Sequence, residues 1–162
     1  MCTVALQLLG PPQIVCDGRP LYINKRKAIA LLAYLAVTAT VHSRDSLATL
    51  FWPEYSQRRA RMYLRQMLYL LTKQLDPDLF TTTRASIGLA ADAALSSDIA
   101  LFQKLHTEGN HCRQVGDDAG ALAAWSEAVA LYHDEFMAGF SLPDTPAFDE
   151  WQRFEREGLQ RQ

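Results

Sequence analysis

The chain has 162 residues, of which 49% are hydrophobic and 21% are charged. This composition excludes a disordered chain and is typical of a soluble globular protein with one medium domain or two small ones. The net charge of −2 excludes no class of partner, but the charge is unevenly divided. Residues 1–92 carry eleven Lys and Arg against six Asp and Glu, whereas residues 93–162 carry five against twelve. The division predicts a half that binds a polyanion, joined to an acidic half that faces a partner.

The cysteines and one apolar run indicate in which cellular compartment the protein is expected. Cys2, Cys16 and Cys112 are odd in number and widely spaced, so we expect no disulfide framework and a reducing, cytoplasmic environment. The apolar run over residues 28–40 is too short to cross a bilayer, and a strand-like segment precedes it. We therefore expect a buried helix in this run, no secretion signal and no membrane partner.

The N-terminal segment combines short strands with a helix. Three strands of a small antiparallel sheet are expected, over residues 3–9, 13–16 and 21–23. The Asp17-Gly18 pair is a strong signal for the turn of a hairpin. Asn24 is expected to cap a helix over residues 25–37, in which apolar residues recur at helical spacing.

Two further helices and a hairpin follow in the basic half. Ser43 is the expected cap of a short helix that Pro53 ends. Ser56 is the expected cap of a long helix that reaches about Leu75. Beyond it, β-rich segments around a turn predict a hairpin over residues 79–89. The order in this half is therefore sheet, three helices and hairpin.

The acidic half is predicted to be helical. We expect helices over residues 98–108, 118–132 and 148–161, with Gly109 ending the first. The last of them reaches Gln162 without a capping residue, so we expect the chain to be part of a longer protein.

The long helix over residues 56–75 has an apolar face and a basic face. On a helical wheel, its core face consists of Ala60, Leu64, Leu68, Leu71 and Leu75. No acidic residue occurs between Ser56 and Leu75. The residues expected outside the core face are Arg58, Arg59, Arg61, Met62, Arg65, Gln66, Tyr69 and Lys73. We predict that these residues bind DNA.

The chemistry of these residue types suits a DNA-reading helix. The major groove of B-DNA admits one α-helix, Arg binds guanine bidentately or neutralises a phosphate, and Gln pairs with adenine. Arg44, on the preceding helix, is expected near a phosphate, and Arg84, at the hairpin tip, near a phosphate or the minor groove. The alternative is a basic face that is merely solvated. The exposed Met62, Tyr69 and Leu70 disfavour that alternative, although they could equally form a protein contact.

The basic half resembles the N-terminal domain of Streptomyces antibiotic regulatory protein (SARP)-type activators. The resemblance lies in LGPPQIVCDGRPLYINKRKAIALLAYLAV, SRDSLATLFWPE and ARMYLRQMLYLLTKQL, and it covers about residues 3–90. It implies an OmpR/PhoB-like winged helix-turn-helix, with the helix over residues 56–75 in the major groove and the hairpin over residues 79–89 as the wing.

The acidic half resembles the bacterial transcriptional activation domain of the same family, which is built of tetratricopeptide-like helix pairs. The segment GDDAGALAAWSEAVALY places Ala121, Trp125, Ala128 and Leu131 at the packing positions of such a pair. The expected fold is mainly α with a small β-sheet, with a DNA-binding domain over residues 1–92 and a helical domain over residues 96–162. The resemblance implies transcriptional activation at promoter repeats and contact with RNA polymerase, and it leaves room for a homodimer on DNA.

No motif of an enzyme or of a cofactor site occurs in the sequence. It lacks a P-loop, a G-x-G-x-x-G and a G-x-S-x-G segment. His106, His111 and Cys112 match no standard metal-ligand spacing and lack a fourth ligand, so we expect no metal. The three tryptophans lie on apolar stripes and are expected in the core. We predict a protein that is not an enzyme and holds no cofactor.

A second function from another class stays open at this point. The chain could be a protein–protein interaction scaffold, in which a winged helix that does not bind DNA stands beside the groove of a helical repeat. Met62, Tyr69 and Leu70 would then contact the partner.

Overall fold

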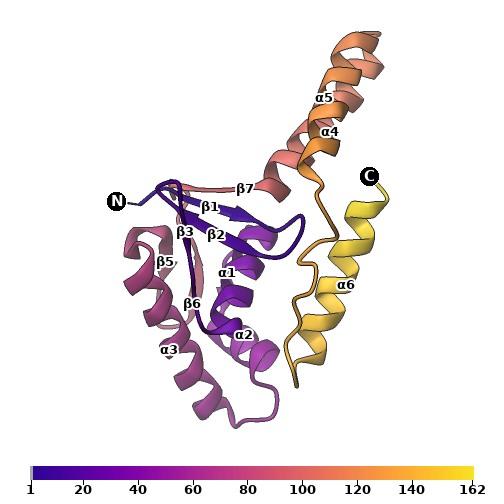
Figure 1. The fold of residues 1–162 in the computed structure, drawn as a ribbon. Helices are drawn as coiled ribbons and strands as arrows, with labels where there is room; N and C mark the ends of the chain where they lie inside the picture. Colours follow the sequence, from indigo (N-terminus) through magenta and orange to yellow (C-terminus); the bar gives the residue numbers. More distant parts are fainter. Residues whose placement is uncertain (1) are drawn as a thin grey trace.

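A computed structural model describes residues 2–162, which form six α-helices and seven short strands (Figure 1). The fold class is the predicted one: a winged helix-turn-helix with small β-sheets, followed by a helical segment. One continuous core of buried apolar side chains runs from the N-terminal sheet through the helices of the basic half to the last helix. None of the helices within the described residues combines the length and the apolar composition that crossing a membrane requires.

The N-terminal sheet has four strands in the order β3-β2-β1-β7. Their bounds are Val4–Gln7 for β1, Gln13–Cys16 for β2, Arg19–Leu21 for β3 and Leu95–Ser97 for β7. The third strand begins earlier than predicted, because the turn at Asp17 and Gly18, both with positive φ, brings Arg19 directly opposite Cys16. Strand β7 was not predicted, and it pairs in parallel with β1.

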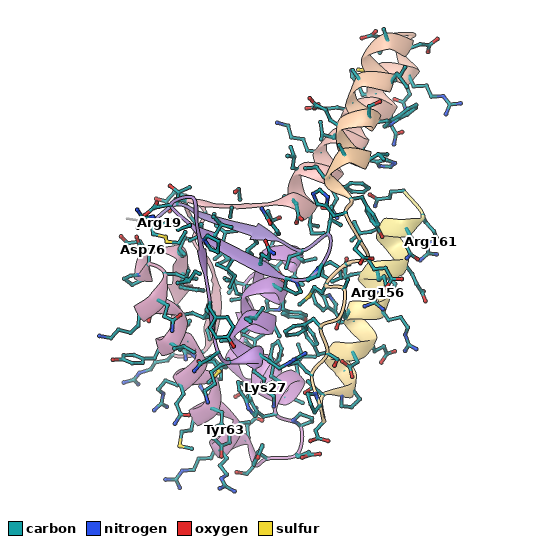
Figure 2. All side chains as sticks on the ribbon, in the orientation of Figure 1. Arg19, Lys27, Tyr63, Asp76, Arg156 and Arg161 are labelled. Carbon is teal, nitrogen blue, oxygen red and sulfur yellow. A yellow bond between two sulfur atoms is a disulfide. The ribbon has the colours of Figure 1, made fainter. Side chains whose placement is uncertain are left out.

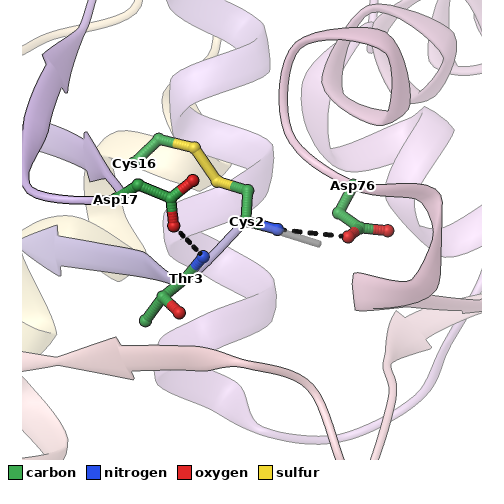
Figure 3. The surroundings of a disulfide bond; sticks show 5 residues. All are labelled: Cys2, Thr3, Cys16, Asp17 and Asp76. Carbon is green, nitrogen blue, oxygen red and sulfur yellow. Dashed lines mark hydrogen bonds between the residues drawn. A yellow bond between two sulfur atoms is a disulfide. The ribbon is translucent and has the colours of Figure 1, made fainter.

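The same hairpin corrects the expectation for the cysteines. Cys2 and Cys16 are joined as a disulfide, with their Cα atoms 6.0 Å apart (Figure 3). The Thr3 amide donates to the Asp17 carboxylate at 2.8 Å, and the Cys2 amide donates to Asp76 at 3.4 Å. The pairing of β1 with β2 brings the two cysteines together, which spacing along the chain does not reveal.

The first helix of the core, α1, spans Arg26–Thr38. The prediction that Asn24 caps it is wrong, because Lys25 occupies the cap position and makes no side-chain cap bond. The helix ends at Ala39, which is left-handed with a φ of 51°. The Lys27 ammonium, labelled in Figure 2, donates to the Phe51 carbonyl at 2.7 Å and so ties α1 to the end of the next helix.

The next two helices begin at the predicted caps. Helix α2 spans Arg44–Phe51, and the Ser43 hydroxyl accepts from the Ser46 amide at 3.0 Å. Helix α3 spans Gln57–Gln74, and the Ser56 hydroxyl accepts from the Arg59 amide at 3.3 Å. These bonds satisfy amides that have no partner within the helix.

The second sheet contains the predicted hairpin. Its three strands run in the order β4-β6-β5, where β4 is His42–Ser43, β5 is Phe80–Thr82 and β6 is Ser86–Leu89. A short 3-10 turn, η1, spans Pro77–Leu79 and joins α3 to β5. Strand β4 was not predicted, since two residues are too short to show a strand pattern. We call the β5–β6 hairpin, residues 80–89, the wing.

The acidic half consists of α4 (Asp98–Gln114), α5 (Asp118–Leu131) and α6 (Pro146–Gln160). The prediction that Gly109 ends the first of these helices is wrong. Gly109 is buried inside α4, where any side chain would overlap the Trp125 indole of α5. This glycine therefore allows two helices to pack closely.

The acidic half is attached to the side of the winged helix-turn-helix that lies away from α3. The Asp98 carboxylate accepts from the amides of Leu8 and Leu9 at 2.8 and 2.9 Å. The Phe148 ring of α6 packs on Phe51 of α2, with ring centroids 5.5 Å apart. In Figure 1, α6 lies beside α1 and α2, and the α4–α5 hairpin projects away from the body. The outer face of α3 is consequently left uncovered.

Candidate nucleic-acid interface

A groove lies between α3, the start of α2 and the wing. Its volume is about 1120 Å³. Thirteen residues line it: Arg44, Gln57, Arg58, Arg61, Arg65, Leu68, Tyr69, Thr72, Pro77, Phe80, Thr82, Thr83 and Arg84. Five of them are arginines and none is acidic. We call this feature the arginine groove.

Helix α3 orients its basic side chains by burying the opposite face. Ala60, Leu64 and Leu71 are at most 1% exposed and Leu68 is 7% exposed, which confirms four of the five residues of the predicted core face. Leu75, the fifth, lies at the position that ends the helix and is half-buried. The burial of this face fixes the rotation of the helix about its axis. The exposed side chains of α3 therefore extend outward, on the side of the molecule opposite α6 (Figure 2), whereas Tyr63, Met67 and Leu70 are half-buried against the core.

Six of the ten residues predicted to bind DNA line the arginine groove. They are Arg44, Arg58, Arg61, Arg65, Tyr69 and Arg84. The structure thus brings together residues of α2, α3 and the wing that lie up to 40 positions apart in the chain.

The other four predicted residues lie on α3 outside the arginine groove. Arg59, Met62, Gln66 and Lys73 are all exposed. The Arg59 guanidinium lies over the Tyr55 ring at 5.5 Å, and the Lys73 ammonium lies over the Tyr69 ring at 5.5 Å. Cation–π contacts at exposed sites are weak, so both cations remain available to an anion.

Two arginines hold the tip of the wing. The Arg44 Nε donates to the Thr83 carbonyl at 2.8 Å, and its backbone amide donates to the Ala85 carbonyl at 2.8 Å. The Arg61 Nη2 donates to the Arg84 carbonyl at 3.0 Å. Three successive carbonyl groups of the wing tip are therefore bonded to α2 and α3.

The positive charge in the arginine groove is largely uncompensated. Within residues 2–162, Arg61 is the one groove arginine with a carboxylate partner inside 4.0 Å, namely Asp45, at 3.5 Å from its Nε. Burial, together with the charges of Arg61 and Arg65, lowers the pKa of the Arg44 guanidinium from its ordinary value. Like charges this close repel each other, and a bound polyanion would relieve the repulsion.

The structure adds polar residues that the sequence analysis missed. Gln57 lines the arginine groove, and its side chain donates to the Asp45 carbonyl at 3.3 Å. Thr83 lines it too, and its hydroxyl accepts from the Ser86 amide at 2.9 Å to close the wing tip. A threonine directly before the predicted turn was a usable signal that Thr83 closes the wing tip. No sequence pattern distinguished Gln57.

Possible metal ligands lie close together away from the arginine groove. Among residues 2–162, one group of His, Cys, Asp or Glu side chains is close enough together for a metal, namely Cys2, Cys16 and Asp17. Its two sulfur atoms are bonded to each other, so they are not free thiolate donors.

Of the three tryptophans expected in the core, Trp52 is buried, whereas Trp125 and Trp151 are half-buried.

The fold and the groove together define a winged helix-turn-helix joined to a helical hairpin region. No family model and no curated protein sequence matches the chain. Among solved structures, EmbR of Mycobacterium tuberculosis, solved in complex with a low-affinity phosphopeptide, matches with a TM-score of 0.81 and 22% sequence identity. The match covers 99% of this chain and 43% of the EmbR chain, so this chain spans less than half of that length. The likeness shows a shared fold, and this fold is of the kind that the SARP resemblance implies.

Proposed function

We propose that this chain is a regulator of transcription that binds specific sequences of double-stranded DNA. The observation that carries the proposal is the arginine groove, whose lining contains five arginines and no acidic residue and is formed by a helix, the start of a second helix and a wing. Phosphate contacts by Arg and Lys supply most of the affinity of such proteins, and side chains on a helix in the major groove supply specificity. The SARP resemblance and the fold shared with EmbR agree with this function.

The geometry suggests how the duplex would be held. Helix α3 would lie in the major groove with its N-terminal residues toward the bases, and the wing would reach the neighbouring minor groove. Arg58, Arg65 and Gln66 are the candidates for base contacts, because all three are exposed and free of carboxylate partners among the described residues. Arg44 and Arg84 would contact phosphates.

The remaining α3 residues would contribute at the edge of the interface. Arg59 and Lys73 would neutralise phosphates, while Met62 and Tyr69, 41% and 62% exposed, would make apolar contacts to bases or sugars.

Several broader assignments belong to this proposal. Residues 1–92 would form the DNA-binding domain, and residues 96–162 would begin a helical activation domain that contacts RNA polymerase. Repeated promoter half-sites would be bound, with two copies of the chain side by side on the DNA. The protein would act on DNA in the cytoplasm, without a cofactor and without catalysis. This location rests on the proposed ligand alone, because the Cys2–Cys16 disulfide removes the cysteine argument for a reducing compartment.

The test is DNA selection followed by binding measurements against salt. Sequences enriched from random duplexes should bind with a negative slope of log affinity on log salt, about −0.9 for each phosphate contact. The variant Arg65→Ala should weaken binding by about 1–3 kcal/mol if Arg65 contacts a base. The matched control is Arg153→Ala, an exposed arginine of α6, which should leave the affinity unchanged. No enrichment, or a flat slope, would contradict the proposal.

The second candidate function is a protein-interaction scaffold. It is favoured by the exposed apolar side chains Met62 and Tyr69 on α3. A partner that co-purifies, and whose binding is lost in Met62→Ala and Tyr69→Ala but kept in Arg65→Ala, would favour the scaffold. Loss of DNA binding in Arg65→Ala would favour the regulator.

A further inference from the structure

We propose that Arg61 is a positioning residue, which holds the wing at a fixed place beside α3, and that Asp45 sets its orientation. The inference rests on the proposed function for its consequence on DNA, but the contact itself exists in the free protein. It separates Arg61 from the other arginines of α3, which sequence analysis treats as equivalent DNA contacts.

The Arg61 side chain is held at two of its nitrogens. Its Nη2 donates to the Arg84 carbonyl at 3.0 Å, and its Nε lies 3.5 Å from the Asp45 carboxylate. The guanidinium group is planar, so fixing two of its nitrogens fixes the plane. Arg61 therefore bridges α2 and the wing from its place on α3.

The backbone of the wing tip is bonded to α2 and α3. The carbonyl groups of exposed turns usually face water. Here the carbonyls of Thr83 and Ala85 accept from Arg44, and the carbonyl between them, that of Arg84, accepts from Arg61. Arg61 thus fixes the backbone of the residue whose side chain is proposed to contact DNA.

Asp45 sets Arg61 apart from the other groove arginines by charge. Asp45 is exposed over 63% of its side chain and stands beside the arginine groove, where it would repel DNA phosphates. Its carboxylate offsets the charge of Arg61, while Arg58, Arg65 and Arg84 have no carboxylate partner among the described residues. An acidic side chain in this place lowers the affinity for DNA of any sequence. Charge attraction alone then does not suffice for binding, and a correctly placed wing is needed as well, which favours selectivity.

The first experiment measures hydrogen exchange of the wing tip, residues 83–86, in the full chain without DNA. Arg61→Ala should speed this exchange several-fold, and Arg61→Lys should do so as well, because an ammonium cannot reproduce the planar fork. Asp45→Asn should give a smaller increase. The control Arg65→Ala should leave the exchange unchanged. Unchanged exchange in both Arg61→Ala and Asp45→Asn would overturn the inference.

The second experiment compares Arg61→Ala, Arg84→Ala and the double variant on a duplex that the wild-type chain binds. If Arg61 acts through the wing, Arg61→Ala weakens DNA binding by about fivefold or more. The double variant then binds DNA about as tightly as whichever single variant has the lower affinity. A direct phosphate contact would instead make the fold-losses of affinity in the two single variants multiply in the double variant, and would reduce the salt slope by about one in Arg61→Ala. That result would overturn the inference. Thermal unfolding of each variant controls for misfolding.

The two experiments separate failure of this inference from failure of the proposed function. If the wild-type chain binds no duplex, the proposed function fails, and the exchange measurement alone still decides whether Arg61 positions the wing. If the wild-type chain binds DNA but wing exchange is the same in all variants, the proposed function stands and the inference fails.

Discussion

His42 links pH to the sheet that carries the wing. Its Nε2 is 2.7 Å from the Thr38 hydroxyl, and its ring lies tilted at 42° to the Tyr34 ring, with centroids 4.9 Å apart. Burial lowers the pKa of this imidazole below its ordinary value of about 6.5. Strand β4, in which His42 lies, pairs with β6 of the wing.

The sign of the pH effect follows from the lowered pKa. As the pH falls below about 6.5, the unfolded chain takes up a proton at this residue before the folded chain does, so the free energy of unfolding falls. The effect is absent above that pH and levels off below the folded pKa. His42→Gln should lose less stability than the wild-type chain between about pH 7.5 and about pH 5.5 in urea unfolding. Equal losses would contradict the assigned role.

Residue roles on α3 could be predicted only in part. The spacing of Ala60, Leu64, Leu68 and Leu71 fixes which face is buried, and that follows from helical geometry alone. The use of Arg61 could not be predicted, because its partners lie 16 residues before it and 23 residues after it and depend on how the wing folds back.

At the scale of elements, Gly109 explains how α4 and α5 pack. Its place in the middle of a helix is unfavourable by intrinsic propensity, yet any side chain there would overlap Trp125. Gly109→Ala should therefore lower the free energy of unfolding by about 1–2 kcal/mol, since overpacking outweighs the gain in helix propensity.

The matched control for this prediction is Gly158→Ala in α6. Nothing lies within 4 Å of the added methyl group at that position. The substitution should raise the free energy of unfolding by about 0.5–1 kcal/mol. If both variants were stabilised equally, the close approach of α4 and α5 would not be the reason for Gly109.

The predicted elements differ in how much local chemistry defines them. Ser43 and Ser56 form the expected caps, because capping depends on three neighbouring residues. The end of α4 was misplaced, because a glycine that ends a helix and a glycine that allows close packing look the same in sequence. Strand β7 was missed because its partner, β1, lies about 90 residues earlier in the chain.

At the scale of the whole molecule, Asp98 fastens the helical segment to the N-terminal sheet. Its carboxylate accepts from two successive backbone amides, those of Leu8 and Leu9. Asp98→Ala would leave these amides without their partner and should lower the free energy of unfolding by about 1.5–3 kcal/mol. Limited proteolysis should then cut the segment between β6 and α4 sooner.

The control for Asp98 is Asp118→Ala, which removes an exposed acid from the first turn of α5. That change should cost only about 0.3–1 kcal/mol through the helix dipole. Equal effects of the two substitutions would show that Asp98 acts on its own helix and not on the attachment of the two halves.

The arrangement of the two halves was beyond prediction from the sequence. Charge division indicated a basic and an acidic half, but the strand pairing, the Asp98 bonds and the packing of Phe148 on Phe51 all join residues 90 to 97 positions apart. Together they place the acidic half on α1, α2 and the first sheet. The arginine groove, whose charge is largely uncompensated, is formed by α3, the start of α2 and the wing, and α3 lies on the side of the molecule away from α6 (Figure 1).

The most direct test of the central claim is to map the surface that DNA covers. Hydrogen exchange of the full chain should be measured with and without a saturating selected duplex. We expect protection in α3, residues 57–74, and in the wing, residues 80–89, with none in α6. Protection confined to α4–α6, or none in α3 while the duplex is bound, would contradict the claim that the arginine groove is the DNA-binding surface.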